Sequence, residues 1–377
     1  MKPSQLTQVT TTVQPKSPRQ YVDSIQIMRG IAALLVVFQH NLHRYPGTLF
    51  TNYLGFLGEE GRFGSGVGAI GVAAFFVISG MVLPISLGQS YHLKQFPMFL
   101  LRRAIRIEPT YLASVIAAAT LVFLMSSLAP HGTPCLPSLK QLALHALYLI
   151  PFSHEAWIQG VYWTLAVEFQ FYLCIGLIFP IIIFAFRKAG RSAALFLSAA
   201  FGLLVLIAHA VPEVMLFQYA TCFAIGMLVA GRRIFSFGIL PIICMTILLE
   251  LLGLWNGHNW NVILGSAVAA MIALFCTGPV NKEGRWIKPF WFLGTISYSL
   301  YVVHQVIASA SENIFHFLLK KVHGTSGLIL ANLVPVASLI AAFIAACLLY
   351  RFVEKPTHEL SRNLRSFFRS SSQHSGA

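Results

Sequence analysis

The sequence predicts an all-α, polytopic membrane protein with about ten transmembrane helices and both termini in the cytoplasm. Three observations lead to this prediction: a scarcity of charge, a series of long apolar segments, and basic residues in alternate loops. Charged residues make up only 10% of the 377 residues and hydrophobic residues 56%. Soluble proteins carry about 25% charged residues, so most of this surface is expected to face lipid. That apolar character argues against a nucleic-acid partner, although the net charge is +14.

Ten segments have about the 20 apolar residues that a helix needs to cross a membrane. They cover residues 25–43, 67–87, 110–129, 162–186, 194–211, 214–231, 236–255, 260–278, 293–319 and 326–353. A shorter apolar stretch, 139–152, lies between Pro137 and Pro151. We expect it to form a re-entrant or interfacial piece in an outer loop.

Lysine and arginine gather in every second loop. These loops lie near residues 2–19, 94–106, 187–191, 232–233, 282–288 and 355–369. Cytoplasmic loops carry such an excess, so the alternation indicates an even number of spans with both ends inside. It also predicts a multi-pass membrane protein in direct contact with lipid.

The alternation divides the chain into three parts. Residues 1–20 are polar and lack an apolar core, so we expect a cytoplasmic N-terminal segment and no cleaved signal peptide. Residues 21–356 form a single membrane domain. Residues 357–377 form a basic cytoplasmic tail that either lies along the inner leaflet or lacks regular structure.

The first apolar helix carries an ionisable residue near each end. Its sequence "RGIAALLVVFQH" begins at Arg29 and ends at His40. Eleven steps along a helix rise about 16 Å and turn about 20° beyond three full turns, so both side chains point the same way. Ionisable residues inside a membrane are costly and usually functional. We therefore expect both to face the bundle interior, with Arg29 near the inner surface and His40 in the outer half.

A glutamate occurs in the fourth apolar segment, within "VYWTLAVEFQFYL". Glu168 is expected one to two turns inside the outer surface, near the depth of His40. A lone carboxylate at that depth is costly unless it is paired, and an imidazole is the natural partner. We expect His40 and Glu168 to form a catalytic pair, with Trp163 from the same segment in a substrate channel.

Another helix contains a polar stripe. In "ISYSLYVVHQ", Ser297, Tyr301 and His304 follow i, i+4, i+7 spacing and therefore share one face. Tyr301 and His304 are expected to line the same channel as Trp163. The alternative is that His304 only binds neighbouring helices together.

Arginines cluster before the third span, in "LRRAIRIEPTY". Arg103 and Arg106 are three residues apart and project from one helical face. Two guanidinium forks at this spacing suit phosphate or pyrophosphate, although a single arginine here would only anchor the helix. We expect Arg103 and Arg106, together with Arg29, to bind the phosphates of a ligand.

Two other patterns do not predict sites. The match "GVGAIG" at 66–71 lacks the strand and βαβ unit of a dinucleotide site, so its glycines are expected to allow a tight loop and close helix packing. No Cys-x-x-Cys or His-Glu-x-x-His pattern occurs, and we predict no metal site. Five of the six cysteines lie in apolar segments, so a disulfide framework is not expected.

Several of these stretches resemble the integral-membrane acyltransferase 3 family over almost the whole chain. The matching pieces are "MRGIAALLVVFQH" (28–40), "GVAAFFVISG" (71–80), "RRAIRIEPTYL" (102–112), "WTLAVEFQFYL" (163–173), "ISYSLYVVHQ" (296–305) and "RFVEKP" (351–356). Their order and spacing are more specific than any one piece. Members that acetylate exopolysaccharide and O-antigen are the most similar.

The resemblance implies a function. Such proteins are bacterial inner-membrane enzymes that move an acyl group, usually acetyl from cytoplasmic acetyl-CoA, to a sugar hydroxyl. Acyl-CoA would be a co-substrate, and no permanently bound cofactor is implied. Three family motifs are matched residue by residue. The basic residue and the histidine of the first helix fall on Arg29 and His40, the Arg-x-x-Arg pair on Arg103 and Arg106, and the Trp-Thr-Leu…Glu segment on Trp163, Thr164 and Glu168.

The sequence departs from the family at one position and leaves other questions open. The family commonly has an acid before Phe-Phe, where this chain has Ala73. Some members carry a C-terminal hydrolase-like domain, so this chain is expected either to act alone or to use a separate periplasmic partner. Direct transfer with His40 as base is favoured over an acyl-His40 intermediate. The acceptor carbohydrate stays open, and a proton-coupled transporter is the alternative function.

Overall fold

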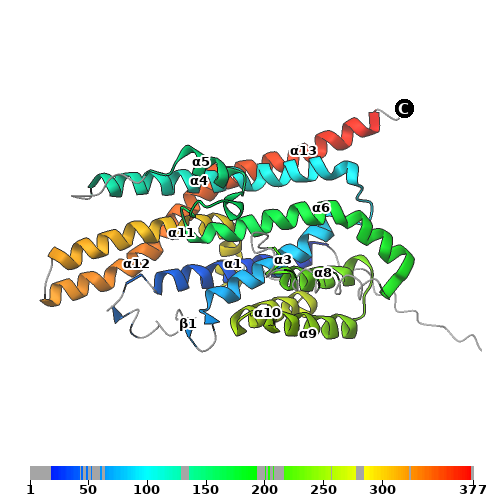
Figure 1. Ribbon diagram of the computed structural model, residues 1–377, viewed down its shortest axis with the longest axis horizontal. Helices are drawn as coiled ribbons and strands as arrows, with labels where there is room; N and C mark the ends of the chain where they lie inside the picture. Colours follow the sequence, from blue (N-terminus) through cyan, green and yellow to red (C-terminus); the bar gives the residue numbers. More distant parts are fainter. Residues whose placement is uncertain are drawn as a thin grey trace, which may run out of the picture.

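The computed structural model describes residues 18–42, 64–128, 136–192, 216–255, 257–276, 284–321 and 324–374, together with single positions or pairs at 44–45, 48–49, 52, 60–61, 200, 203 and 207. It is an all-helical bundle (Figure 1). Its longer helices are α1 (Pro18–Leu42), α3 (Gly68–Leu87), α4 (Phe96–Leu128), α5 (Leu139–Ala146), α6 (Trp163–Ala189), α8 (Ala220–Ile234), α9 (Ile239–Trp255), α10 (Trp260–Phe275), α11 (Ile287–Lys321), α12 (Gly324–Leu349) and α13 (Lys355–His374).

Short elements join these helices. They are the 3-10 turns η2 (Leu93–Gln95), η3 (Ile150–Phe152), η4 (Gly160–Tyr162) and η5 (Gly190–Ser192), and the π-helical turn η6 (Tyr350–Glu354). Two-residue strands β1 (Glu60–Gly61) and β2 (Gly64–Ser65) pair antiparallel before α3. Apart from these two short strands, every regular element of the described residues is helical, so the all-α prediction is confirmed.

Within the described residues, five helices are long and apolar enough to cross a membrane. They are Gly68–Leu87, Leu93–Met125, Gly160–Lys188, Ile287–Phe317 and Ile329–Leu364. Ile239–Trp255 and Trp260–Phe275 are shorter apolar helices. The expected span 194–211 lies almost wholly outside the described residues, so the count of ten spans and the side of each terminus stay predictions.

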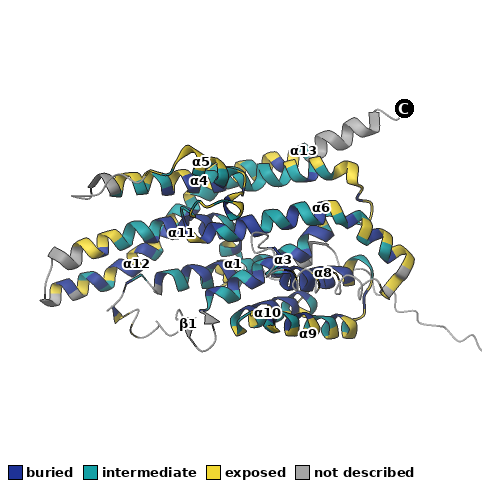
Figure 2. Ribbon diagram, viewed as in Figure 1, coloured by how far each residue is buried: buried dark blue, intermediate teal, exposed yellow. Residues whose placement is uncertain are grey.

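The first helix lies at the centre of the bundle, packed between α11 and α3, where Figure 2 shows mostly buried ribbon. Glycines allow this close approach. A Cβ placed on Gly30 would lie 2.7 Å from the backbone nitrogen of Gly294 on α11, and one on Gly71 of α3 would collide with the Ala32 carbonyl oxygen. The packing role expected for the glycines of residues 66–71 is thus confirmed at Gly71. This proximity carries Arg29 and His40 into the interior.

Helix α4 differs from its prediction. We expected a span from residue 110 and a cytoplasmic loop before it, but the helix begins at Phe96 and continues through Pro109. Arg103 and Arg106 therefore project from a rigid helix. The loop prediction failed because charged residues were taken to end the span, although their long side chains can turn toward the interior or the interface.

The segments on either side of α4 also take definite structure. The stretch predicted as re-entrant or interfacial begins with α5, which packs against α4 and buries His145. The tail from residue 357 is helical as far as His374, so lack of regular structure is wrong for that part. Helix α13 lies beside α4 (Figure 1), and the Ser361 hydroxyl donates to the Arg102 carbonyl oxygen at 2.8 Å.

Candidate active site

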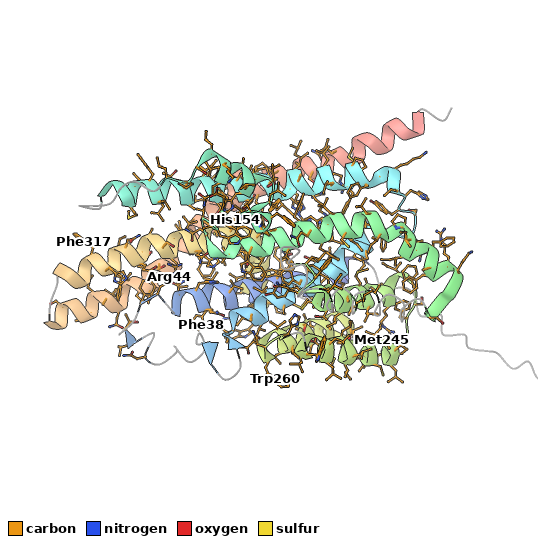
Figure 3. All side chains as sticks on the ribbon, viewed as in Figure 1. Phe38, Arg44, His154, Met245, Trp260 and Phe317 are labelled. Atoms are coloured by element: carbon orange, nitrogen blue, oxygen red, sulfur yellow. The ribbon has the colours of Figure 1, made fainter. Side chains whose placement is uncertain are left out.

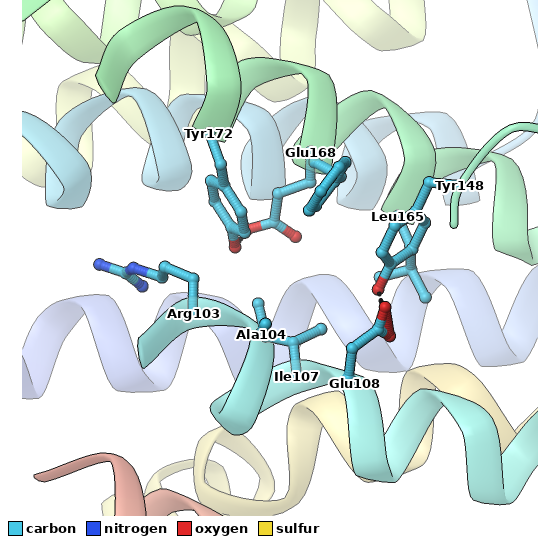
Figure 4. Close-up of a pocket in the computed structure, with 9 residues that line it drawn as sticks. Arg103, Ala104, Ile107, Glu108, Tyr148, Leu165, Glu168 and Tyr172 are labelled. Carbon is cyan, nitrogen blue, oxygen red and sulfur yellow. Dashed lines mark hydrogen bonds between the residues drawn. The ribbon is translucent and has the colours of Figure 1, made fainter. Parts of the chain in front are cut away.

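A small, partly open cavity lies between α4 and α6. Its lining residues are Arg103, Ala104, Ile107, Glu108, Tyr148, Leu165, Glu168, Phe169 and Tyr172. Figure 4 shows Glu168 and Tyr172 reaching from α6 toward α4, with the Tyr148 hydroxyl donating to Glu108. The cavity therefore has a cationic and a carboxylate side within an otherwise apolar and aromatic wall.

Arg103 provides the cationic side. Its guanidinium donates to the Ser86 hydroxyl at 3.2 Å. It also lies 5.6 Å from the ring centre of Tyr172 and 5.8 Å from that of Phe99, which are cation–π distances. These contacts hold the charge in place and leave several of its five N–H donors without an acceptor among the residues that the structure describes.

The other two predicted arginines join this region. Arg29 lies within electrostatic reach of Arg106, Glu354 and Glu168, so α1 and α4 bring these two arginines together, and Glu168 of α6 lies near them. Neither Arg29 nor Arg106 makes a hydrogen bond to any residue that the structure describes. Guanidinium groups that are half-buried without acceptors suit an anionic ligand, because phosphate oxygens would satisfy these donors.

Glu168 is not paired with His40. Its carboxylate accepts hydrogen bonds from the Ser79 hydroxyl, at 2.8 Å, and from the Tyr172 hydroxyl. It also lies within electrostatic reach of Arg103 and Arg29. The structure thus places Glu168 near the arginines, and the predicted pairing of Glu168 with His40 is wrong.

Positions along α3 explain this difference. The backbone nitrogen of Gly68 donates to Gln39, the neighbour of His40, and marks the histidine level. Ser79 lies eleven residues farther along (79 − 68), or about 16 Å, and Ser86 another seven (86 − 79), or about 10 Å. The carboxylate therefore lies nearer the arginine level. The sequence argument failed because the start of α6 already lies beside Tyr301, where the Thr164 and Tyr301 hydroxyls are 2.7 Å apart, so Glu168 lies one turn farther along the helix.

His40 instead lies beside His304. The Nδ1 atom of His40 is 2.8 Å from the Val36 carbonyl oxygen and 3.4 Å from Nε2 of His304, and Nδ1 of His304 is 2.7 Å from the Tyr301 carbonyl oxygen. A carbonyl oxygen can only accept, so both Nδ1 atoms carry the proton. Nε2 of His304 can then accept from Nδ1 of His40, and Nε2 is the unprotonated, basic nitrogen of the neutral His40 ring.

The other two predicted channel residues, Tyr301 and Trp163, lie in different surroundings. The Tyr301 hydroxyl and the Thr164 hydroxyl are 2.7 Å apart, next to the histidine pair. Trp163 points elsewhere, because its ring stacks on Tyr219 at 5.1 Å and meets Phe76 edge-on. The structure therefore brings Tyr301 to the histidines but places Trp163 in an aromatic cluster.

Three participants were missed from the sequence. Ser79 and Tyr172 hold Glu168, and Glu354 lies within electrostatic reach of Arg29 and Arg106. Tyr172 follows Glu168 by four residues, a spacing that places two side chains together on a helix, so that pair could have been found. Ser79 had no such signal.

Two groups of side chains therefore share one face of the central helix. The arginine group (Arg29, Arg103 and Arg106) can bind an anion, and the histidine pair (His40 and His304) holds an imidazole that can accept a proton when neutral. The eleven residues from Arg29 to His40 separate them by about 16 Å along α1.

Comparison with known proteins agrees with a transferase. The family model described as an acyltransferase domain matches residues 22–351. Neither the comparison with curated proteins nor the comparison with solved structures gave a match. The family match covers most of the chain and includes both groups of side chains. This protein belongs to the acyltransferase 3 family of membrane acyltransferases.

Proposed function

We propose that the protein moves an acetyl group from cytoplasmic acetyl-CoA to a hydroxyl of a cell-envelope or exported carbohydrate, in the bacterial inner membrane. The observation that supports this most is the placement of an anion-binding group and a proton acceptor on one face of α1. The extended pantetheine arm of CoA has the length to span the distance between them. The acceptor would enter from the outer side.

Donor phosphates would bind to Arg29, Arg103 and Arg106. Arg103 is held by Ser86 and Tyr172, so part of the site is already ordered before the donor arrives. Preorganised cations lose less conformational freedom on binding. Glu168 takes a different role from the one first expected: it offsets the arginine charges and is not the partner of the catalytic histidine.

His40 would act as the general base. The acceptor hydroxyl oxygen attacks the thioester carbonyl carbon while its proton passes to Nε2 of His40. The C–S bond then breaks, and the CoA thiolate takes the proton back from His40. His304 stabilises the transient imidazolium because its Nε2 accepts from Nδ1 of His40, the role that a carboxylate plays in a serine protease triad. General-base assistance contributes about 10²–10⁴-fold.

Complementation of a deletion strain tests this function. Inverted membrane vesicles receive acetyl-CoA labelled in the acetyl group, and ester-bound label on envelope glycans is measured by mass spectrometry. Wild type and His154→Ala, an exposed histidine shown in Figure 3, should label the glycan. His40→Ala should accumulate in the membrane yet lose about 10²–10⁴-fold of the label. Normal labelling by His40→Ala would overturn the mechanism.

The same assay distinguishes the transporter alternative. A carrier would move its solute without modifying it, so no acetyl label would reach the glycan. The acyltransferase 3 match favours transfer over transport. Partner dependence is tested by repeating the assay with purified protein and purified acceptor, because a required periplasmic partner would then be absent.

A further inference from the structure

The segment "RFVEKP" at 351–356 has no role in the mechanism above. Its first four residues belong to the π-helical turn η6 between α12 and α13. Single π-helical turns are rare and are often found at functional sites. This turn contains Glu354, whose carboxylate accepts from the Ser299 hydroxyl at 2.6 Å and from the Ser299 backbone N–H at 3.1 Å.

Glu354 is thus fixed by α11 and not by the arginines. It lies within electrostatic reach of Arg29 and Arg106, but no hydrogen bond joins it to either among the described residues. Two hydrogen-bond donors from Ser299 and two nearby cations partly offset the cost of burying this carboxylate in its ionised form. Its influence on the arginines therefore acts through charge at a fixed position.

We propose that Glu354 is an electrostatic positioning residue that offsets Arg29 and Arg106 and so weakens the binding of phosphate-bearing CoA. This inference rests on the proposed function. Acetyl-CoA and the product CoA carry the same phosphates, so a site with three arginines and only Glu168 to offset them would hold the product as firmly as the donor. A fixed carboxylate lowers the potential at the phosphate site and lets CoA exchange.

The test measures equilibrium binding to purified protein in detergent. The probes are acetyl-CoA and S-acetylpantetheine, which has the same thioester arm but no phosphate. Glu354→Gln removes the charge, and its amide oxygen can still accept from Ser299. We expect it to lower the Kd for acetyl-CoA by about three- to ten-fold and to change the Kd for S-acetylpantetheine by less than about two-fold.

Two control variants separate charge from structure. Ser299→Ala removes the 2.6 Å hydrogen bond but keeps the carboxylate, so it should not tighten acetyl-CoA binding. Glu359→Gln makes the same charge change at an exposed position of α13 and should leave the Kd for acetyl-CoA unchanged. Melting temperature in detergent checks that each variant is folded.

The outcomes distinguish this inference from the proposed function. A Kd for acetyl-CoA that stays the same or rises in Glu354→Gln overturns the inference, as does equal tightening of both probes or tightening by Ser299→Ala. If Arg103→Ala with Arg106→Ala leaves acetyl-CoA binding unchanged, the donor site itself is wrong. Loss of binding in that double variant, combined with no change in Glu354→Gln, would remove only the role of Glu354.

Discussion

The arginine group (Arg29, Arg103 and Arg106) and the histidine pair (His40 and His304) lie against one face of α1. They differ in whether their polar atoms have hydrogen-bond partners. Arg29 and Arg106 have no hydrogen-bond acceptor among the residues described. His40 and His304 each place one ring nitrogen against a backbone carbonyl oxygen. Unsatisfied cationic donors favour an anionic ligand, whereas a ring with a fixed tautomer suits proton transfer. The same helix therefore carries one group adapted to binding and another adapted to chemistry.

The largest expected effect tests whether the histidines act as a pair. His304→Ala removes one of the two acceptors that face Nδ1 of His40 and should lower the rate of acetyl transfer by on the order of 10²-fold. The Kd for acetyl-CoA should stay the same, because His304 lies beside His40 and away from the arginine group. Transfer is measured in vesicles and binding in detergent.

His316→Ala provides the matched control. This residue lies on the same helix, α11, and its side chain is exposed, so the variant should retain normal transfer. Equal losses in both variants would mean that the effect comes from α11 packing. The pairing of His40 with His304 would then have no catalytic meaning.

The second prediction concerns the arginine group. Arg103→Ala combined with Arg106→Ala should raise the Kd for acetyl-CoA by about 10- to 100-fold or more, since hydrogen bonds to charged groups contribute about 1.5–3 kcal/mol each. Binding of S-acetylpantetheine should change little. Arg285→Ala, at an exposed position before α11, should bind normally. Unaltered acetyl-CoA binding by the double variant would reassign these arginines to helix anchoring.

The third prediction concerns Glu168, which was expected beside His40 but lies near the arginines. Glu168→Gln should lower the Kd for acetyl-CoA by up to about ten-fold, because it removes a negative charge that lies near the arginines. The pH dependence of transfer should keep its wild-type midpoint. A moved midpoint with unchanged donor affinity would restore Glu168 as the partner of the catalytic histidine.

Much of this arrangement could be predicted from local spacing. The face shared by Arg29 and His40 follows from helical periodicity, and so does the pair Arg103 and Arg106. All four lie where those patterns placed them relative to their own helices. Periodicity relates residues of one helix because its geometry is fixed.

Contacts between helices could not be predicted in the same way. The partner of Glu168 depended on the level at which α6 begins, and Thr164 at its start already lies beside Tyr301. The link between Ser299 and Glu354 depends on a π-helical turn, which adds one residue to a turn and has no simple sequence signal. Depth and register between helices are set by packing, such as the Gly30–Gly294 approach.

The smallest expected effect on transfer comes from a third buried histidine. His145 of α5 uses both ring nitrogens: Nδ1 lies 2.9 Å from the Tyr111 hydroxyl, and Nε2 accepts from the Ile158 backbone N–H at 3.2 Å. Because Nε2 accepts, the ring is neutral and its proton is on Nδ1. Such a ring has no lone pair left for chemistry, so we predict a purely structural role.

This role gives His145 a pH signature that the catalytic pair need not share. Burial lowers the pKa of His145 from 6.5 to about 4, so the unfolded chain binds more protons than the folded one between these values. The stabilisation is present above about pH 6.5 and is lost as the pH falls through about 4. Between pH 7 and pH 5 the loss is about 2 kcal/mol, which should lower the melting temperature in detergent by several degrees.

Replacement with phenylalanine isolates this contribution. His145→Phe should be less stable than wild type at pH 7, because the Tyr111 hydroxyl and the Ile158 N–H lose their partner. Its melting temperature should fall less between pH 7 and pH 5, while His154→Phe should follow the wild-type curve. Transfer by folded His145→Phe at pH 7 should stay within about two-fold of wild type. A much larger loss of transfer would extend the chemistry beyond the His40–His304 pair to a region where every ring nitrogen already has a partner.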